Sequence, residues 1–315
     1  MGIDLRDKKI LYELDKNARV SYSEIAKKIK LSKNAVINRI KEMEKQQIIL
    51  GYNTLININE LGFTTYDVYL KFKDTTLEKE KEIIDSLIKN KEVWFVGKCE
   101  GDINLALLIS TKTPEEFDKI WNNIYSKIKH HIEVVRIAIL LEYHHFGRKY
   151  LLEDKKERAI AIVGKRSNQE VPVKDLKILK ILSQNARISL LDMSEKLKLT
   201  PKAVHYRIEK LKKQNIILGY KANINFSKLG YEYYKVMIEL NDLEIIPKLY
   251  DWILSNPNAV YYDKFIGGHD FEFDLELASF NLFVKFIEEL KAKFKGTIKQ
   301  YSFLRPTIIY KSNYF

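Results

Sequence analysis

The chain has 315 residues, of which 46% are hydrophobic, and it carries a formal net charge of +12 at pH 7. No apolar run approaches the roughly 18 residues that a membrane span needs, and the first residues form no apolar signal region, so we expect a cytoplasmic protein. Cys99 is the only cysteine, which excludes a disulfide framework and a cysteine metal site.

The first 60 residues have the pattern of three short helices. Apolar residues recur at helical spacing from Leu5 to Leu14, which predicts the first helix. Ser21 is expected to cap the second helix, with Glu24 completing a capping box, and Ser32 to cap the third. The buried side of the third helix is expected to consist of Val36, Ile40 and Met43.

From Thr64 onward the apolar residues alternate with polar ones, which is typical of strands. The predicted order of elements is βαββαβ, a ferredoxin-like sheet with helices on one face. The expected elements are a strand from residue 64, a helix at 77–90, hairpin strands at 92–100 and 103–111, a helix at 114–130 and a strand at 132–143.

The second half of the chain repeats the first at a constant offset of 168 residues. Asn185 and Tyr220 correspond to Asn17 and Tyr52, and roughly half of the positions between residues 7 and 63 are identical in the copy. A repeat of this length indicates a duplicated two-part unit rather than a solenoid. The expected domains are three-helix units at 1–60 and 173–230, sheet domains at 61–150 and 231–315, and a linker with one strand at 151–172, the strand lying within 159–163.

The positive charge lies almost entirely in the two three-helix units. Lys and Arg exceed Asp and Glu by 4 in residues 1–60 and by 9 in residues 173–230, whereas residues 61–150 are neutral and 231–315 carry −2. Charge confined to compact helical units indicates a polyanionic partner there. The alternative is that these lysines are simply solvated.

One set of residues, nearly all repeated in the copy, resembles the Lrp/AsnC (feast/famine) family of transcription regulators. The matching residues are the opening from Asp7 to Leu14, Asn17-Ala18-Arg19, Leu31-Ser32, Val36, Arg39-Ile40, Ile48 through Tyr52, and Leu61-Gly62. The resemblance implies a winged or plain helix-turn-helix DNA reader joined to a ligand-sensing, oligomer-forming sheet domain. The expected fold class is therefore α+β with two such units in tandem, although a typical family member has one unit per chain.

A recognition helix in the major groove needs hydrogen-bonding side chains near its N-terminus. Arg39 and Arg207 lie toward the flank of their helices, where they suit a DNA phosphate or a structural ion pair. Ile37 could meet a thymine methyl group or pack on a neighbour, and any outward polar residue could simply be solvated. The expected DNA-binding residues are Ser32, Lys33, Asn34, Ile37, Asn38, Arg39 and Lys41 in the first copy, and Thr200, Lys202, His205, Tyr206 and Arg207 in the second.

Asp102 and Asp270 follow glycine-containing turns where the family has its β-hairpin turn. The resemblance implies an effector site there, with Gly101 and Gly268, in which a carboxylate could hold the ammonium of an amino acid. The alternative is that each Asp only stabilises its turn. No metal or cofactor is expected, because the adjacent histidine pairs point to opposite faces of their strands.

An acidic row follows the second turn. Asp270, Glu272, Asp274 and Glu276 share one face of a strand, and the resemblance implies a family dimer that buries that face against a partner sheet. Carboxylates in a row would repel their own copies. We therefore predict that this face meets basic residues of the first half, namely Lys71, Lys73 and Arg136, so that the halves form a pseudo-dimer within one chain. A homo-oligomer, or a solvated acidic face, remains the alternative.

The sequence predicts a sequence-specific DNA-binding transcriptional regulator and no enzyme. Its expected partner is double-stranded DNA, and the implied effector is an amino-acid-like small molecule. Two alternatives remain. Some tandem proteins that resemble this family are sirohaem decarboxylases, a role that needs His and Arg around a large pocket. The other alternative is an architectural DNA-binding protein without sequence preference.

Overall fold

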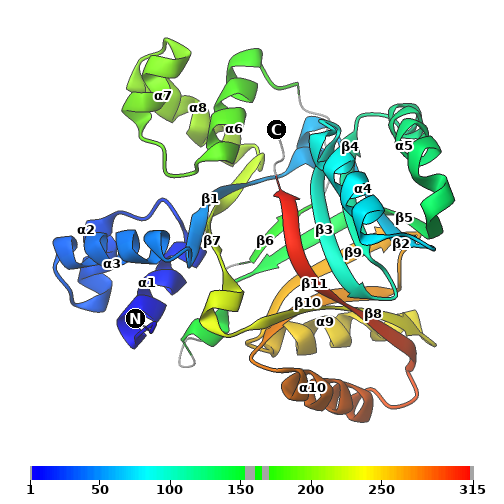
Figure 1. Cartoon of the computed structure of the whole chain (residues 1–315). Helices are drawn as coiled ribbons and strands as arrows, with labels where there is room; N and C mark the ends of the chain where they lie inside the picture. The colour runs from blue at the N-terminus through cyan, green and yellow to red at the C-terminus, as the bar shows by residue number, and fades with distance from the viewer. Residues whose placement is uncertain (1, 153–159, 165–169, 313–315) are drawn as a thin grey trace.

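The computed structural model describes residues 2–152, 160–164 and 170–312, and it places two helical units beside a large ring of strands (Figure 1). Among the described residues, no helix is long and apolar enough to cross a membrane. Part of the expected linker, including the charged run at 153–158 and most of 164–170, lies outside the described residues.

Each helical unit has the three predicted helices. Side chains of Ser21, Ser32, Ser189 and Thr200 accept hydrogen bonds from backbone N–H groups in the first turns of their helices. The reciprocal capping box occurs at the first helix, between Asp4 and the residue three positions on, rather than at Ser21. The helices are α1 (Leu5–Lys16), α2 (Tyr22–Ile29) and α3 (Lys33–Lys45) in the first unit, and α6 (Val173–Gln184), α7 (Leu190–Leu197) and α8 (Pro201–Lys213) in the second.

The two helical units are joined by a two-stranded antiparallel sheet. Strand β1 (Ile49–Ile56) pairs with β7 (Ile217–Ile224), from Ile49 opposite Ile224 to Ile56 opposite Ile217. Helix α1 packs on β7 and α6 packs on β1, so each unit rests on the strand of the other. The strand after each third helix is therefore a shared ribbon between the units, not a wing within one unit.

Both halves contain the predicted βαββαβ order. Strand β5 continues to Phe146, past its expected end at residue 143, and its counterpart β11 is equally long and ends at Ser312. The first half contains β2 (Thr64–Phe72), α4 (Leu77–Lys89), β3 (Val93–Gly101), β4 (Leu105–Thr111), α5 (Pro114–Ile128) and β5 (Ile132–Phe146). The second contains β8 (Glu232–Leu240), α9 (Ile246–Ser255), β9 (Ala259–Ile266), β10 (Phe271–Leu277), α10 (Phe280–Lys293) and β11 (Ile298–Ser312). A short strand, β6 (Ile160–Val163), and 3-10 turns at Ile58–Leu61, Lys129–His131, Lys149–Leu151, Phe226–Leu229 and Leu243–Ile245 complete the described elements.

The long strands close the two half-sheets into one ring. Strand β5 pairs with β2 of its own half and then with β9, while β11 pairs with β8 and then with β3. The strand order is β2-β4-β3-β11-β8-β10-β9-β5, and the pairing of β5 with β2 closes the ring. The short strand β6 also pairs with β5. Closure removes free sheet edges, which otherwise invite pairing with other chains.

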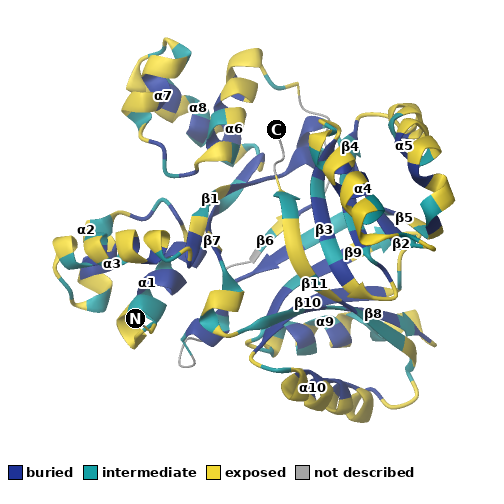
Figure 2. Ribbon diagram, viewed as in Figure 1, coloured by how far each residue is buried: buried dark blue, intermediate teal, exposed yellow. Residues whose placement is uncertain are grey.

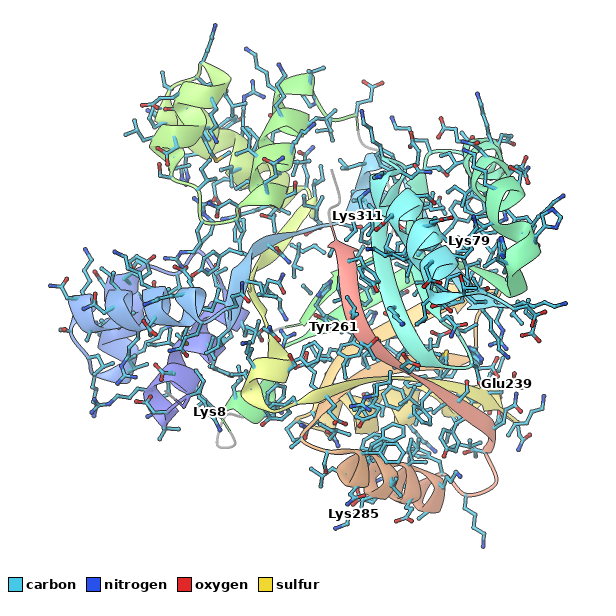
Figure 3. The ribbon with its side chains drawn as sticks, viewed as in Figure 1. Lys8, Lys79, Glu239, Tyr261, Lys285 and Lys311 are labelled. Carbon is cyan, nitrogen blue, oxygen red and sulfur yellow. The ribbon has the colours of Figure 1, made fainter. Side chains whose placement is uncertain are left out.

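The helices cover the outside of the ring. Helices α4 and α5 lie over the first half and α9 and α10 over the second, with exposed outer faces (Figures 1 and 2). Lys285 on α10 points into solvent, whereas Tyr261 on β9 lies in the middle of the molecule (Figure 3). Strand β10 alternates accordingly: Phe271 and Phe273 pack under the helices, and Glu272 and Asp274 are buried inside the ring.

Candidate nucleic-acid interface and central pocket

Helices α3 and α8 each combine a buried apolar side with a polar side in solvent. Val36 and Ile40 anchor α3, and Val204 and Ile208 anchor α8. Tyr206 is 70% exposed, so this large aromatic side chain extends into solvent. The remaining exposed residues of the predicted set are Ser32, Lys33, Asn34, Asn38 and Lys41 in the first unit and Thr200, Lys202 and His205 in the second, whereas Ile37 is half-buried.

The two flanking arginines form structural ion pairs. Arg39 Nη1 lies 2.8 Å from Asp7 Oδ1 and 2.9 Å from Asp4 Oδ2, and these hydrogen bonds raise the pKa of Arg39. Arg207 Nη1 lies 2.6 Å from Oδ1 of the buried Asp175. Each arginine therefore fixes the third helix of its unit to the first helix, which is the ion-pair alternative for these residues.

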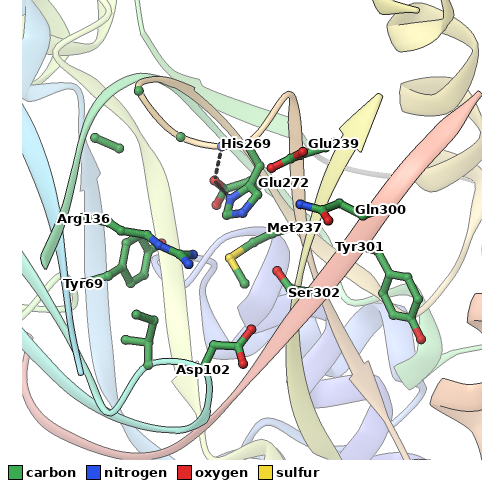
Figure 4. A pocket seen from close by; sticks show the side chains of 14 residues that line it. Tyr69, Asp102, Arg136, Met237, Glu239, His269, Glu272, Gln300, Tyr301 and Ser302 are labelled. Carbon is green, nitrogen blue, oxygen red and sulfur yellow. Dashed lines mark hydrogen bonds and ion pairs between the residues drawn. The ribbon is translucent and has the colours of Figure 1, made fainter. Parts of the chain in front are cut away.

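A central pocket of about 520 Å³ opens where the β3–β4 and β9–β10 turns of the two halves face each other. Figure 4 shows Arg136 and Asp102 pointing into it from the first half and His269 and Glu272 beside it from the second. His269 donates its backbone N–H to Glu272 Oε1 at 3.2 Å. The whole lining consists of Tyr69, Asp102, Ile103, Arg136, Ala138, Met237, Glu239, Gly267, Gly268, His269, Glu272, Gln300, Tyr301 and Ser302.

The residues predicted for an effector site fall in different environments. Asp102 and Gly268 line the central pocket, and Gly101, at φ +124°, lies next to it. Asp270 instead accepts a hydrogen bond at 2.8 Å from the backbone N–H of Leu240, at the end of the neighbouring strand β8. The duplicated aspartates therefore have different surroundings in the two halves.

The acidic row meets cations other than those expected. Lys71 forms an ion pair with Glu133 at 3.4 Å, and Lys73 is exposed, so neither faces the row. Arg136 lines the same pocket as Glu272 but forms no ion pair with it. The cations that bind the row are Lys235, from the neighbouring strand of the same half, and Arg148, from the segment after β5. The prediction placed the acidic face correctly against protein but named the wrong cations.

Lys235 is the centre of a buried acid cluster inside the ring. Its Nζ contacts Asp263 directly and lies 3.2 Å from Glu272 and 3.7 Å from Asp274. Asp67 of β2 is 7% exposed and its Oδ1 has no hydrogen-bond partner. Burial, opposed in part by Lys235, raises the pKa of Asp67 to about 7. Ionisation of all four carboxyl groups around one ammonium, away from water, would cost a large free energy.

This cluster makes the stability of the protein depend on pH. The pKa of Asp67 is higher in the folded chain than in the unfolded chain, so the folded chain holds this proton more tightly. The resulting stabilisation of the folded state is fully present at pH values below the ordinary carboxyl pKa, and it is lost as the pH rises toward about 7. We expect Asp67→Asn to match the parent Tm at pH 5 and to exceed it by about 2 °C or more at pH 8. Thermal unfolding at the two pH values measures this, with Asp85→Asn on the exposed face of α4 as the control. Equal Tm differences at both pH values would exclude the titration of Asp67.

A second buried network connects the first helical unit to the ring. Arg148 donates from its backbone N–H and Nη1 to Asp15 of α1 at 2.9 and 2.8 Å. Its Nε and Nη2 donate to Glu276 of β10, both at 2.9 Å. Tyr150 also donates to Glu276, and Lys221 donates to Phe146 O at 2.9 Å. Sequence reasoning missed this network, because Arg148 lies in a segment without periodicity.

Comparison with known proteins places these features in a family. The family model of winged helix-turn-helix DNA-binding domains matches twice, at residues 3–49 and 173–217. The HTH-type transcriptional regulator LrpA of Pyrococcus horikoshii is 38% identical over 143 residues, which are 97% of that protein and 44% of this chain. LrpA of Pyrococcus abyssi is 37% identical over the same shares. The chain belongs to the Lrp/AsnC family of transcriptional regulators. One family member thus accounts for about half of this Lrp/AsnC chain, as a tandem duplication requires.

Solved structures extend the likeness to the whole chain. The siroheme decarboxylase NirDL matches with a TM-score of 0.62 at 13% identity, over 98% of this chain and 93% of that one. A second NirDL structure matches with a TM-score of 0.64 at 12% identity. The prediction that the chain is no enzyme is contradicted by these neighbours, because solved chains with this architecture are siroheme decarboxylases. A tandem Lrp/AsnC fold is compatible with an enzyme, and at this identity the likeness concerns the fold alone.

Proposed function

We propose that the chain is a sequence-specific DNA-binding transcriptional regulator that carries both of its DNA readers, residues 1–60 and 173–230, in one polypeptide. The observation that carries the proposal is the pair of helix-turn-helix units joined through β1 and β7, with α3 and α8 presenting polar faces to solvent. The net charges of +4 and +9 on these units suit the DNA backbone. We infer that one chain takes the place of a homodimer, because the sheets of residues 61–150 and 231–315 close on each other.

The outward residues differ between the readers. Asn34 and Asn38 of α3 correspond to Lys202 and Tyr206 of α8. A pair of non-identical readers suits a site with two unlike half-sites about 34 Å apart, one turn of B-DNA. Selection of bound sequences from a random pool of duplex DNA tests this proposal. A two-part motif is expected, with affinity that falls steeply as salt rises. Enrichment of no motif would favour an architectural DNA-binding protein instead.

The central pocket supports the finer proposal of a small-molecule effector. Its volume lies within the range of ligand sites, and its lining includes Arg136 and Asp102, for neither of which an ion pair occurs among the described residues. These two charges suit the carboxylate and the ammonium of an amino-acid-like zwitterion. We expect free amino acids to raise the Tm of the parent chain and not that of Arg136→Gln. An equal rise in both proteins would place the ligand elsewhere.

The NirDL architecture supplies a second candidate, an enzyme that acts on a tetrapyrrole. It is favoured by the whole-chain likeness in fold and by the pocket between the halves, which includes His269 and Arg136. The three carboxylates of Asp102, Glu239 and Glu272 in the same lining suit a polyanionic substrate less well. Titration with siroheme separates the candidates, because binding would shift the absorption spectrum of the tetrapyrrole.

A further inference from the structure

Two arginines clamp the helical units to each other. Arg19 and Arg187 occupy the same position of the repeat, in the turn between the first and second helices of each unit. Arg19 Nη1 donates to the backbone carbonyl of Ala186 at 2.6 Å. Arg187 Nη1 donates to the carbonyl of Ala18 and, at 3.3 Å, to that of Val20. The contact is reciprocal, since each arginine reaches across to the turn of the other unit.

Backbone hydrogen bonds extend the same contact. Ala18 N–H donates to Tyr220 O at 2.8 Å, and Ala186 N–H donates to Tyr52 O at 2.9 Å. Both alanines are fully buried, so no water can replace these partners. Each turn is therefore attached to the other unit through its N–H and its carbonyl together.

Aromatic rings hold the two guanidinium groups in place. Arg19 lies 5.4 Å from the centre of the Tyr220 ring, and Arg187 lies 4.6 Å from Tyr22 and 5.2 Å from Tyr52. Neither arginine forms an ion pair among the described residues. A planar guanidinium can donate to carbonyls while it packs on rings, which a lysine ammonium does less well. These two arginines therefore hold the turns through hydrogen bonds and ring contacts and not through ion pairs.

The clamp lies where it controls the distance between the readers. Each turn leads directly into the second helix of its unit, α2 or α7, and the recognition helix follows within a few residues. The ribbon of β1 and β7 leaves each unit at the other end of its recognition helix. The clamp therefore adds a tie near the start of each recognition helix, and its loss would leave the ribbon and the packing of α1 on β7 and of α6 on β1 to hold the units together.

We infer that Arg19 and Arg187 are positioning residues that set the half-site spacing the chain accepts. They act through the alanine turns and need no contact with DNA. Half-site spacing mirrors the fixed separation of two recognition helices. The inference rests on the proposed function as far as DNA is concerned, but the mechanical role of the clamp can be measured without DNA.

The first experiment measures affinity against spacing. Duplexes carry the two selected half-sites with zero to six extra base pairs between them, and the full chain is compared with the double variant Arg19→Gln, Arg187→Gln. The parent is expected to prefer one spacing by about tenfold or more, and the variant by about threefold or less, with equal affinity for a single half-site. Arg6→Gln, which removes a positive charge from the exposed face of α1, should keep the parental spacing profile.

An unchanged spacing profile in the double variant would overturn the inference. Equal losses for single and paired half-sites would also overturn it, because the arginines would then contact DNA or maintain the fold. Arg19→Lys with Arg187→Lys should restore part of the spacing preference, since lysine keeps one donor.

The second experiment needs no DNA. Spin labels at Glu42→Cys and Lys210→Cys, equivalent exposed positions on α3 and α8, report the separation of the readers, and Cys99 is buried away from the label. We expect a narrow distance distribution in the parent and one about twice as wide in the arginine double variant. Identical widths would overturn the clamp whether or not the chain binds DNA. Absence of DNA binding by the parent, with a broadened variant, would contradict only the proposed function.

Discussion

Replacement of Arg148 by methionine is expected to lower the free energy of unfolding by about 3–5 kcal/mol. Arg148 is 6% exposed and binds two carboxylates, Asp15 and Glu276, which are 1% and 0% exposed. The substitution leaves both acids buried with one cation fewer, so that Lys221, at 3.8 Å, is the cation left beside Asp15 and Glu276 loses its ion pair. Chemical denaturation at neutral pH measures the loss.

The control for this prediction is Arg136→Met, in which an exposed arginine of the same ring is replaced. Its stability should stay within about 0.5 kcal/mol of the parent. A loss below about 1 kcal/mol for Arg148→Met would mean that the network does not hold the first helical unit on the ring. At the repeat-equivalent positions, Ser183 of the second helical unit replaces Asp15 and Leu108 of the first half replaces Glu276, so the sequence does not repeat this pair of carboxylates.

Removal of the exposed side chains of α8 is expected to weaken DNA binding more than the matching change in α3. The double variant Lys202→Ala, Tyr206→Ala should lose about ten- to a hundredfold in affinity, because both exposed side chains lie near the start of the recognition helix. The matching double variant of α3 is Asn34→Ala, Asn38→Ala. It should lose less DNA affinity, because it removes no positive charge and because the first unit carries +4 rather than +9.

Electrophoretic mobility shifts at two salt concentrations test this prediction. The α8 variant should also show a shallower salt dependence, because a lysine that can neutralise a phosphate is gone. Lys285→Ala, on α10 at the far side of the ring, controls for loss of charge and should bind as the parent does. Equal losses in the α3 and α8 variants would contradict unequal readers.

Local patterns were sufficient to predict the elements. Caps such as Ser32 and Thr200 and the alternation of Phe271 to Leu277 determine which segments form helices and strands. Ring closure could not be predicted in this way, because it depends on β5 and β11 each continuing past one partner strand to another. Which strands pair over long sequence distances depends on the whole chain, so the pattern of a short sequence segment does not predict it.

The candidate sites, too, were predictable from the sequence only in part. Asp274 lies directly opposite Lys235 in the β10–β8 register, so the cation of the acidic row was available from the predicted topology. Asp102 and Asp270 look equivalent in sequence, yet only Asp102 reaches the pocket, because Asp270 binds the N–H of Leu240. Arg19 and Arg187 were recognised only as repeated residues. Their partners are backbone carbonyls, which no side-chain pattern reveals.

The central claim is that one chain reads two unlike half-sites with two unlike readers. Its most direct test is footprinting of the selected site, followed by affinity measurements in which either half-site is replaced by a copy of the other. The account predicts one protected region that spans both half-sites, and a loss of affinity of at least about fivefold for either replacement. Equal affinity for the original and both replaced sites, or no protected region, would contradict it.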